Sequence, residues 1–363
     1  MPAETQLVPS IVDSKRRFDS WLSEQLGDEL VRADLAEKDK LLRESPFVFL
    51  RGSYWRWAET ILEICPSLAD APPVLAVGDI HLENFGTWRD ADGRLVWGVN
   101  DFDEAAEMPY VLDLVRLATS VALAEDARKG LLPDACQAIL KGYLDGIANP
   151  GAIVLDRKWQ WLRDDVTVAD DRRKRFWKKL DARVAEMAPA HFHGSLAAAM
   201  PAGVTEFDTA RRVAGTGSLG RPRWIGVANW QGADVVREAK KILPSAWYLT
   251  RLPAPSTSRC ADAANGKFRA GDPWYVARDG IVVRRLSPNN RKVEVENRSD
   301  FLLSASMHDV MGRELANVHM GNGASNDAVR DDLMKRHSKW LVSAAEQAAK
   351  FVTADFKALK KSG

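Results

Sequence analysis

One stretch of the sequence constrains the fold more than any other: "VLAVGDIHLENFGTWRDADGRLVWGVNDFDEA", residues 74–105. Its apolar runs are typical of buried strands, yet acidic and amide side chains stand directly beside them. Charged groups next to a core are costly unless they are paired, bound to a metal or functional. The stretch therefore predicts that a strand and a hairpin gather polar side chains at one place.

The local pattern predicts the elements of this stretch. "PPVLAVGD" reads as a buried strand opened by prolines, and Asp79 closes it. "FGTW" and "RLVWGVN" flank the pair Asp92-Gly93, which is a strong hairpin signal. Because a hairpin returns the chain to its start, we expect Asp101 to approach Asn84 although they are distant in the sequence.

Asp79, Asn84 and Asp101 have the chemistry of a magnesium site. Carboxylate and amide oxygens suit Mg²⁺, a hard cation that also keeps waters and substrate phosphates as ligands. The spacing D-x-x-x-x-N, followed by a hairpin and D-F, is the arrangement of the kinase catalytic loop and its metal-binding Asp. On this interpretation Asp79 is the catalytic base, and Asn84 and Asp101 bind the metal. A capped loop is the alternative, because Asp and Asn are common turn residues.

Neighbouring polar residues are predicted to support this site. We expect His81 to orient the loop, and Asp103 and Glu104 to add a metal ligand or a substrate contact, or to lie in a solvated turn. Asp113 and Arg116 lie one helical turn apart after "NDFDEA". They are predicted either to brace the metal loop or to form a simple i,i+3 helix pair.

"GDIH" also resembles one block of the binuclear metallophosphatases, in which Asp and His both bind metal. Those enzymes need further histidine-containing blocks downstream. The remaining histidines stand in "APAHFHGS", "SMHDV", "ANVHM" and "KRHSK", and none of these fits. A metallophosphatase is therefore the third hypothesis for the function.

The string "GTGSLG" satisfies G-x-G-x-x-G at Gly215, Gly217 and Gly220. A dinucleotide-binding site requires a helix to open straight after such a loop. Here "RPRWIGVANW" continues as a strand, so the loop joins two strands, as in the phosphate-binding flap of kinases. We predict that these glycines and Ser218 bind nucleotide phosphates; a plain tight hairpin is the alternative.

The next strand, "ADVVREAKK", should carry a cation for the phosphates. Arg237 occupies the expected place, and Lys240 follows just beyond it. Arg and Lys are not interchangeable at such a site. Both residues are therefore predicted phosphate ligands, with Arg237 as the weakest element of a kinase interpretation.

The order of predicted elements gives an α+β chain. Residues 1–200 are predicted to form a mainly helical large lobe with the metal loop and hairpin, and residues 205–300 a small antiparallel β lobe with the Gly-rich loop. Residues 301–363 are predicted to form helices that pack on the body. Within these parts, residues 11–45 read as one polar helix and "RKVEVENR" as a strand.

Composition excludes several classes of protein. The chain has 363 residues, a net charge of +1, 46% hydrophobic and 28% charged residues, which is ordinary for a soluble globular protein. Near-neutral charge gives no reason to expect nucleic-acid or membrane partners. Three separated cysteines without C-x-x-C spacing indicate neither a disulfide framework nor a zinc site. "MPAETQLVPSIVDSKRR" lacks the apolar core of a signal peptide, so we expect a cytoplasmic location.

The blocks "SPFVFLRG", "GDIHLENFG", "NDFDEA", "DLVRLATS", "GTGSLG", "VVREA" and "GRELANVH" occur in the same order as in a bacterial family. Over about residues 40–320 the chain resembles the domain-of-unknown-function family 2252, which is grouped with the protein-kinase-like superfamily. The resemblance implies a fold related to aminoglycoside and choline kinases, whose "GDLHPGN" and "DFD" blocks match Asp79, Asn84 and Asp101. The family usually has Lys where this chain has Arg237.

Because the catalytic half precedes the Gly-rich segment, the resemblance implies a protein-kinase-like two-lobe fold with circularly permuted lobes. The leading hypothesis is a phosphotransferase that uses ATP and Mg²⁺ and acts on a small molecule. Nothing resembling a kinase activation segment with A-P-E follows "NDFDEA", which favours a small-molecule acceptor. The competing hypotheses are a non-catalytic nucleotide-binding pseudokinase or sensor, and a nucleotidyl transferase that moves AMP from a nucleotide. The sequence predicts no particular oligomeric state.

Overall fold

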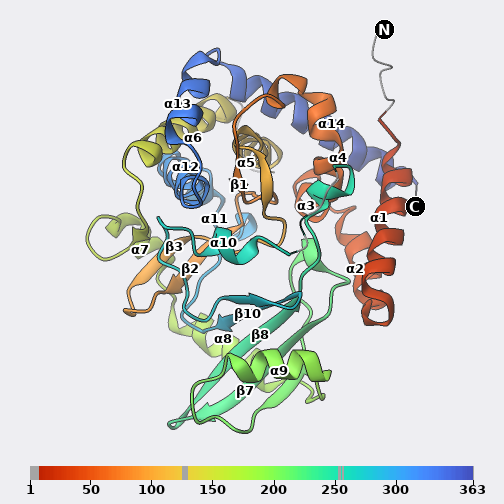
Figure 1. Cartoon of the computed structure of the whole chain (residues 1–363), viewed down its shortest axis with the longest axis vertical. Coiled ribbons are helices and arrows are strands. Elements are labelled where there is room, and N and C mark those ends of the chain that lie inside the picture. Colours follow the sequence, from red (N-terminus) through yellow and green to blue (C-terminus); the bar gives the residue numbers. More distant parts are fainter. Residues whose placement is uncertain (1–7, 125–129, 252–254, 256, 363) are drawn as a thin grey trace.

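The computed structural model describes residues 8–124, 130–251, 255 and 257–362, and it has an α+β fold. About half of the chain is helical, and the strands form small antiparallel sheets. Most helices form one body, and a five-stranded sheet stands at its lower end in Figure 1. Among the described residues, no helix is both long enough and apolar enough to cross a membrane.

The elements follow one another as α1–α4, β1–β4, α5–α6, β5, α7–α9, β6–β8, α10, β9–β10 and α11–α14. The helices are α1 Ile11–Leu26, α2 Arg32–Leu41, α3 Pro46–Gly52, α4 Tyr54–Ile64, α5 Val111–Leu123, α6 Leu131–Ala148, α7 Gln160–Val166, α8 Asp170–Asp181, α9 Ala190–Ala198, α10 Cys260–Ala264, α11 Val295–Leu302, α12 Ala305–Met320, α13 Asn326–Lys335 and α14 Trp340–Lys361. The strands are β1 Pro73–Ala76, β2 Phe85–Arg89, β3 Leu95–Val99, β4 Ala106–Pro109, β5 Ile153–Val154, β6 Asp208–Arg211, β7 Arg223–Trp230, β8 Ala233–Lys241, β9 Val276–Arg278 and β10 Ile281–Leu286.

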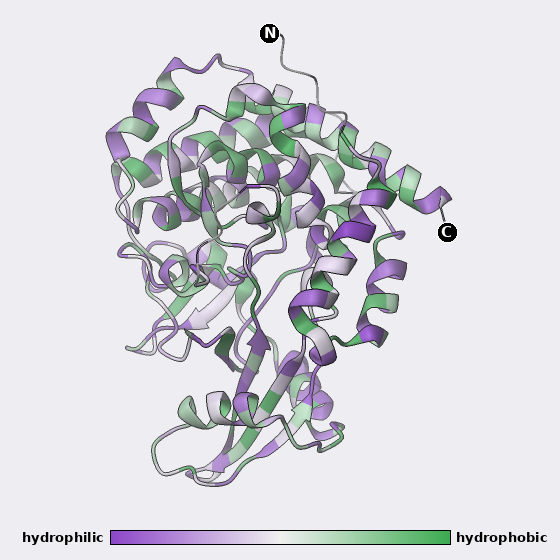
Figure 2. Ribbon diagram, turned by 45° about the vertical axis from the view of Figure 1, so that its right-hand side comes forward, coloured by the Kyte–Doolittle hydropathy of each residue, from purple (hydrophilic) through white to green (hydrophobic). Residues whose placement is uncertain are grey.

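Helix α5 lies at the centre of the helical body. Its sequence "VLDLVRLATSVAL" is apolar on all sides, as expected of a helix surrounded by others, and every side chain from Val111 to Val121 is buried. Helices α6, α12 and α14 pack around it. Figure 2 shows hydrophobic residues facing the interior of this body and hydrophilic residues on its outer surface. Two polar residues of α5, Asp113 and Arg116, are therefore buried inside the main hydrophobic core.

Helices α6 and α12 pack unusually closely because glycines stand at their contact. A side chain added at Gly312 on α12 would overlap the carbonyl oxygen of Ile139 on α6. A side chain at Gly142 on α6 would in turn overlap the backbone of Asp309 on α12. The two backbones therefore touch where these glycines lie.

The predicted hairpin is confirmed. Strands β2 and β3 pair antiparallel, with Phe85 opposite Val99, and Gly93 in the connecting turn has a φ of +76°. Strand β5 adds a third strand that the sequence did not predict. Strand β1 pairs with β4, so the chain that leaves the hairpin after Asp101 returns beside the end of β1.

The five-stranded sheet has the order β6-β7-β8-β10-β9, with every neighbouring pair antiparallel. The turn between β7 and β8 is Gln231-Gly232, and both residues have positive φ. The turn Asp279-Gly280 joins β9 to β10 in the same way. Primed turns of this kind match the twist of paired strands and fix their register.

The two faces of this sheet have different coverings. Helix α9 covers one face, where it buries Trp224, Ala239, Ile281 and Val283. Helix α8 covers the far part of the other face, where it buries Ile225, Val227 and Val236. The near part of that second face points toward the helical body, and its side chains are charged, as described below.

Two element predictions were wrong. Residues 11–45 form two α-helices instead of one, because Gly27 has a φ of +51° and ends α1. "RKVEVENR" contributes a single bridge from Lys292 to Gly86 and then begins α11. The carboxylate of Glu83 accepts a hydrogen bond from the free N–H of Val295 at 2.8 Å, which stabilises that helix start. The boundaries predicted at residues 205 and 300 stay a prediction; strands β6–β10 span 208–286.

We expect Gly312→Ala to destabilise the protein by roughly 1–3 kcal/mol, because the added methyl group overpacks a contact between two backbones. Gly194→Ala is the matched control, since Gly194 lies within α9 and a methyl group there meets nothing within 4 Å. It should be neutral or stabilise by up to about 1 kcal/mol through helix propensity. Urea unfolding curves measure both, and equal stability of the two variants would contradict the close contact.

Candidate functional site

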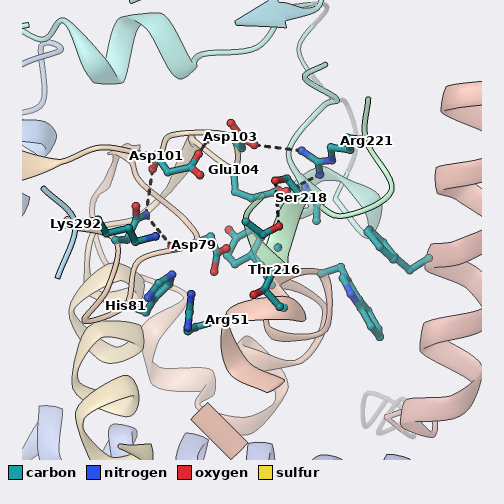
Figure 3. Close-up of a pocket in the computed structure, with 18 residues that line it drawn as sticks. Arg51, Asp79, His81, Asp101, Asp103, Glu104, Thr216, Ser218, Arg221 and Lys292 are labelled. Atoms are coloured by element: carbon teal, nitrogen blue, oxygen red, sulfur yellow. Dashed lines mark hydrogen bonds and ion pairs between the residues drawn. The ribbon is translucent and has the colours of Figure 1, made fainter. Parts of the chain in front are cut away.

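Asp79, Asn84 and Asp101 lie together at the boundary between the helical body and the five-stranded sheet. Asp79 follows β1, Asn84 precedes β2, and Asp101 follows β3. Figure 3 shows Asp79 and Asp101 facing one cavity, with the Gly-rich loop residues Thr216 and Ser218 on its other side. The three residues therefore lie close together, as the hairpin predicted, and the Gly-rich loop lines the same cavity.

Asp113 of α5 fixes the loop that carries Asp79. Its two carboxylate oxygens accept hydrogen bonds from the backbone N–H groups of Val77 (2.7 Å) and Gly78 (3.0 Å). One of these oxygens also lies 3.0 Å from Nε2 of His319 on α12, and Nδ1 of that ring lies 2.8 Å from the hydroxyl of Tyr143. Asp113 is fully buried, so each of these partners replaces solvation that burial removed.

Arg116, one turn further along α5, contacts Asp79 directly. Its Nη2 forms a short ion pair with Oδ1 of Asp79 and donates to the carbonyl oxygen of Leu50 at 2.7 Å. Burial raises the pKa of the Asp79 carboxyl above its ordinary value, and the charge of Arg116 opposes this rise. Of the two predicted roles for Asp113 and Arg116, bracing the loop is the one that the contacts favour.

Asn84 ties the two acidic segments together. Its Nδ2 donates to the backbone carbonyl oxygens of Asp79 (3.0 Å) and Asp101 (3.1 Å). Its Oδ1 is buried and has no hydrogen-bond partner among the described residues. A buried acceptor without a partner is costly unless a ligand satisfies it. This oxygen and the carboxylate of Asp101 are thus the donors that a hard cation would use.

Lys240 on β8 reaches Asp101 and Asp103 from the sheet. Its Nζ lies 3.3 Å from Oδ1 of Asp101 and 2.5 Å from Oδ1 of Asp103. Burial disfavours the charged form of Asp101, but the charges of Lys240 and Arg284 outweigh that effect and hold its pKa well below the ordinary range. Burial and the neighbouring charge of Asp101 raise the pKa of Asp103. Asp101 is therefore the more acidic carboxylate of this pair.

Glu104 and His81 are held by local contacts. Glu104 Oε1 accepts from Arg221 at 3.0 Å, and its Oε2 accepts from the backbone N–H of Ala246 at 2.7 Å. Nδ1 of His81 accepts from the backbone N–H of Glu83 at 3.1 Å, and burial lowers the pKa of this imidazole well below its ordinary value. Both residues line the cavity, and the contact of His81 with Glu83 favours its predicted role in orienting the loop.

The Gly-rich loop is fastened to the N-terminal helices. Nζ of Lys38 on α2 donates to the carbonyl oxygen of Gly217 at 2.9 Å, and the N–H of Val31 donates to the carbonyl oxygen of Gly220 at 3.0 Å. A side chain at Gly217 would begin 3.3 Å from Oδ2 of Asp79, so the loop passes directly over that carboxylate. Gly215 and Gly220 have φ values of +79° and +95°, which explains glycine at both positions.

The structure does not bring all predicted phosphate ligands to the cavity. Gly215, Gly217 and Ser218 line it, whereas Gly220 packs against Leu35 outside it. The predicted placement of Arg237 at the site was wrong. Its Nε donates to the carbonyl oxygen of Ala199 at 2.8 Å, and its guanidinium group stacks on Trp274.

The reason lies in the alternation of side chains along β8. Successive residues of a strand point to opposite faces, so Arg237 and Ala239 share the face under α9, while Glu238 and Lys240 share the face toward the body. Lys240, the second candidate, is therefore the cation of β8 that reaches the acidic residues.

Two connected cavities make up the site. One, of about 60 Å³, is lined by Asp79, Asn84, the Gly-rich loop, and the aromatic side chains of Phe18 and Trp55. The other, of about 520 Å³, lies between the hairpin, the sheet and the segment from Leu286 to Glu294. The two cavities share residues that include Asp101, so they adjoin at that carboxylate.

Several lining residues had no motif that predicted them. These are Arg51, Thr216, Arg221, Arg223, Arg284 and Lys292. The string "GRPRW" is the one local pattern that could have indicated two of them. Its arginines, Arg221 and Arg223, stand two residues apart directly after the Gly-rich loop. Thr216 is a variable position of the Gly-rich string, and Arg51, Arg284 and Lys292 reach the cavities through long-range packing.

The described residues include no group of three or more His, Cys, Asp or Glu side chains placed to hold a metal ion. A magnesium site built from one Asn and one Asp, with water and phosphate as the further ligands, needs no such group. Asn84 and Asp101 fit a magnesium site of this kind, because both carry oxygen ligands. Oδ1 of Asn84 has no hydrogen-bond partner among the described residues.

The family model for uncharacterized proteins conserved in bacteria, DUF2252, matches residues 30–203 and 198–362. The chain belongs to the DUF2252 family. The two matched ranges together contain Asp79, Asn84, Asp101, the Gly-rich loop and β8, so these parts of the site lie within the match to the family model. Comparison with curated proteins and with solved structures gave no match.

We expect Asp113→Asn to destabilise the protein by roughly 1–3 kcal/mol, because asparagine offers one acceptor oxygen where two backbone N–H groups each bind their own. Asp92→Asn removes the same charge from the exposed hairpin turn and is the control. Its stability should stay within about 0.5 kcal/mol of the wild type. Urea unfolding tests both variants, and an unchanged midpoint for Asp113→Asn would contradict its anchoring role.

Lys38 generates a prediction about pH. Burial, together with the charge of Arg221, lowers the pKa of its ammonium group from 10.5 to about 8. Between these values the unfolded chain binds more protons than the folded chain, so this group makes the protein more stable as pH rises from 8 to 10.5. Relative to Lys38→Met, the wild type should gain up to about 3 kcal/mol over this range. The measurement is the unfolding free energy of both proteins at each pH. A wild type whose stability relative to Lys38→Met falls from pH 8 to 10.5 would refute the prediction.

Proposed function

We propose that this DUF2252 protein is a phosphotransferase that uses ATP and Mg²⁺ and acts on a small molecule. The observation that carries the proposal is the convergence of Asp79, Asn84 and Asp101 directly beneath the Gly-rich loop, with Lys240 reaching the same place from β8. Phosphoryl transfer depends on positioning and charge stabilisation, and these are the groups that such a reaction needs.

The arrangement of the sheet and the body supports a protein-kinase-like fold with permuted lobes. The sheet carries the Gly-rich loop between its first two strands and the lysine on the third, while the body carries the acidic residues. In chain order the body segment with Asp79 comes first and the sheet second, the reverse of an ordinary kinase. Permutation preserves a site when the spatial arrangement survives.

Asn84 and Asp101 would hold Mg²⁺, since they present the unpartnered amide oxygen and the ionised carboxylate. When bound, the ion neutralises charge on the phosphates. Asp79 accepts the proton of the attacking hydroxyl or orients it, and Arg116 fixes its carboxylate for that role. Lys240 and the N–H groups of the loop bind the phosphates.

The shape of the site favours a small acceptor. The cavity beside Asp79 has a volume of about 60 Å³, and Phe18 and Trp55 close it on the side of the N-terminal helices. The Gly-rich loop is fastened to α2 on that same side. This arrangement favours the hydroxyl group of a small molecule over a protein segment next to Asp79.

The first test is ligand binding. Thermal shift with ATP should show stabilisation that is larger with Mg²⁺ than with EDTA, and Asp101→Asn should remove the metal-dependent part. Asp92→Asn, on the exposed end of the same hairpin, should behave as the wild type. No stabilisation by ATP in either condition would overturn the proposal and the nucleotide sensor together.

The second test is turnover. A panel of hydroxylated metabolites with radiolabelled ATP should identify an acceptor, and Asp79→Asn should lower kcat by about 10²-fold or more without loss of ATP binding. Transfer of label from the α-phosphate instead of the γ-phosphate would assign AMP transfer. ATP binding without any turnover across the panel would assign the non-catalytic sensor.

A further inference from the structure

Three arginines of the five-stranded sheet surround a single carboxylate. Arg212, Arg223 and Arg284 each form an ion pair with Glu238 of β8, Arg223 at 2.8 Å and Arg284 at 2.7 Å. We call these residues the arginine cluster. They come from the end of β6, from β7 and from β10, so the antiparallel register is what gathers them.

The arginine cluster carries more positive charge than its carboxylate neutralises. Glu238 is fully buried and needs one cationic partner, yet three guanidinium groups share it. Burial lowers the pKa of Arg212 to about 9 and that of Arg223 to about 10, and the neighbouring arginines add to both shifts. Like charges held together at a partly buried place are destabilising unless an anion joins them.

The guanidinium groups are not used up by the protein. In the described part of the chain, the hydrogen bonds of Arg284 engage its Nε, and those of Arg212 engage its Nη1. All three arginines line the cavity of about 520 Å³. A guanidinium fork with free N–H groups matches the oxygens of a phosphate group.

The position of the arginine cluster connects it with the Gly-rich loop. Nη2 of Arg223 donates to Oγ of Ser218 at 2.7 Å, and a side chain at Gly215 would begin 3.5 Å from that same nitrogen. The charge of Arg284 also acts on Asp101. An anion held by these arginines therefore lies at the root of the loop, beside the acidic residues.

We infer that Arg212, Arg223 and Arg284 form a phosphate-binding site in the larger cavity, and that it binds phosphate-bearing ligands without a metal ion. The inference goes beyond the proposed function, because it requires neither Asp79 chemistry nor Mg²⁺. The shared ligand chemistry is a phosphate group with several negative charges, which belongs either to a nucleotide or to another phosphorylated metabolite.

The test is calorimetric titration in EDTA at constant ionic strength. Inorganic tripolyphosphate is the principal probe, and ATP and a hexose bisphosphate are the arms that distinguish a nucleotide from another metabolite. The wild type should bind tripolyphosphate, and Arg284→Gln should bind it at least tenfold more weakly. Arg284→Lys should fall between the two, because it keeps the charge and loses the fork.

Arg211→Gln is the matched control. Arg211 neighbours Arg212 on β6 but points to the other face, where it pairs with Glu186 and stacks on Trp224. The Arg211→Gln variant removes the same charge from the same sheet but leaves the arginine cluster intact. Its tripolyphosphate affinity should therefore stay within twofold of the wild type. If Arg284→Gln does not fold, Arg212→Gln replaces it, since that side chain is 31% exposed.

Two results would overturn the inference: a wild type that does not bind tripolyphosphate, or an Arg284→Gln variant that binds it as tightly as Arg211→Gln. Failure of the proposed function looks different. If the protein binds tripolyphosphate but shows no ATP turnover, the phosphotransferase proposal fails and the phosphate-binding arginine cluster stands. ATP turnover by Arg284→Gln with an unchanged KM, together with tripolyphosphate binding as tight as that of Arg211→Gln, removes the arginine cluster and leaves the phosphotransferase.

Discussion

The carboxylate of Asp113 is the group on which the rest of the site depends. It binds the backbone of Val77 and Gly78 from α5 and meets His319 of α12, so it joins three segments that are distant in sequence. Because it is fully buried, water cannot replace these hydrogen-bond partners if they are lost. The position of Asp79, one residue after Gly78, is therefore set by the hydrophobic core, and a displacement of α5 or α12 would move its carboxylate.

The site has opposite charges on its two sides. The helical body contributes Asp79, Asp101 and Asp103, and the sheet contributes Lys240 and the arginine cluster. A divalent cation complements the first side and a phosphate-bearing ligand the second. Each ligand would relieve repulsion that the folded chain otherwise carries, so we expect the two to bind more tightly together than separately.

Local rules in the sequence were enough for the acidic cluster and insufficient for the sheet. The Asp92-Gly93 turn predicted that Asn84 meets Asp101, because a hairpin is a short-range structure. The prediction for Arg237 was wrong because the face of the sheet to which its side chain points depends on where β8 begins and on which strands β8 pairs with. The contact of Lys38 with the Gly-rich loop had no signal at all, since 179 residues separate its partners and general packing decides it. Family membership and the α+β class are established, whereas the chemical roles of the site residues stay predictions.

The turn at Gln231-Gly232 has a consequence for how the site tolerates sequence change. It sets Trp230 opposite Ala233, and the pairing of β7 with β8 then continues unbroken to Arg223 opposite Lys240. A slip of this pairing by one residue would turn every side chain of β8 to the other face. Arg237 would then point at the acidic residues and Lys240 away from them. The place of Lys240 at the site therefore depends on the register of β7 with β8 and not on the length of the turn itself.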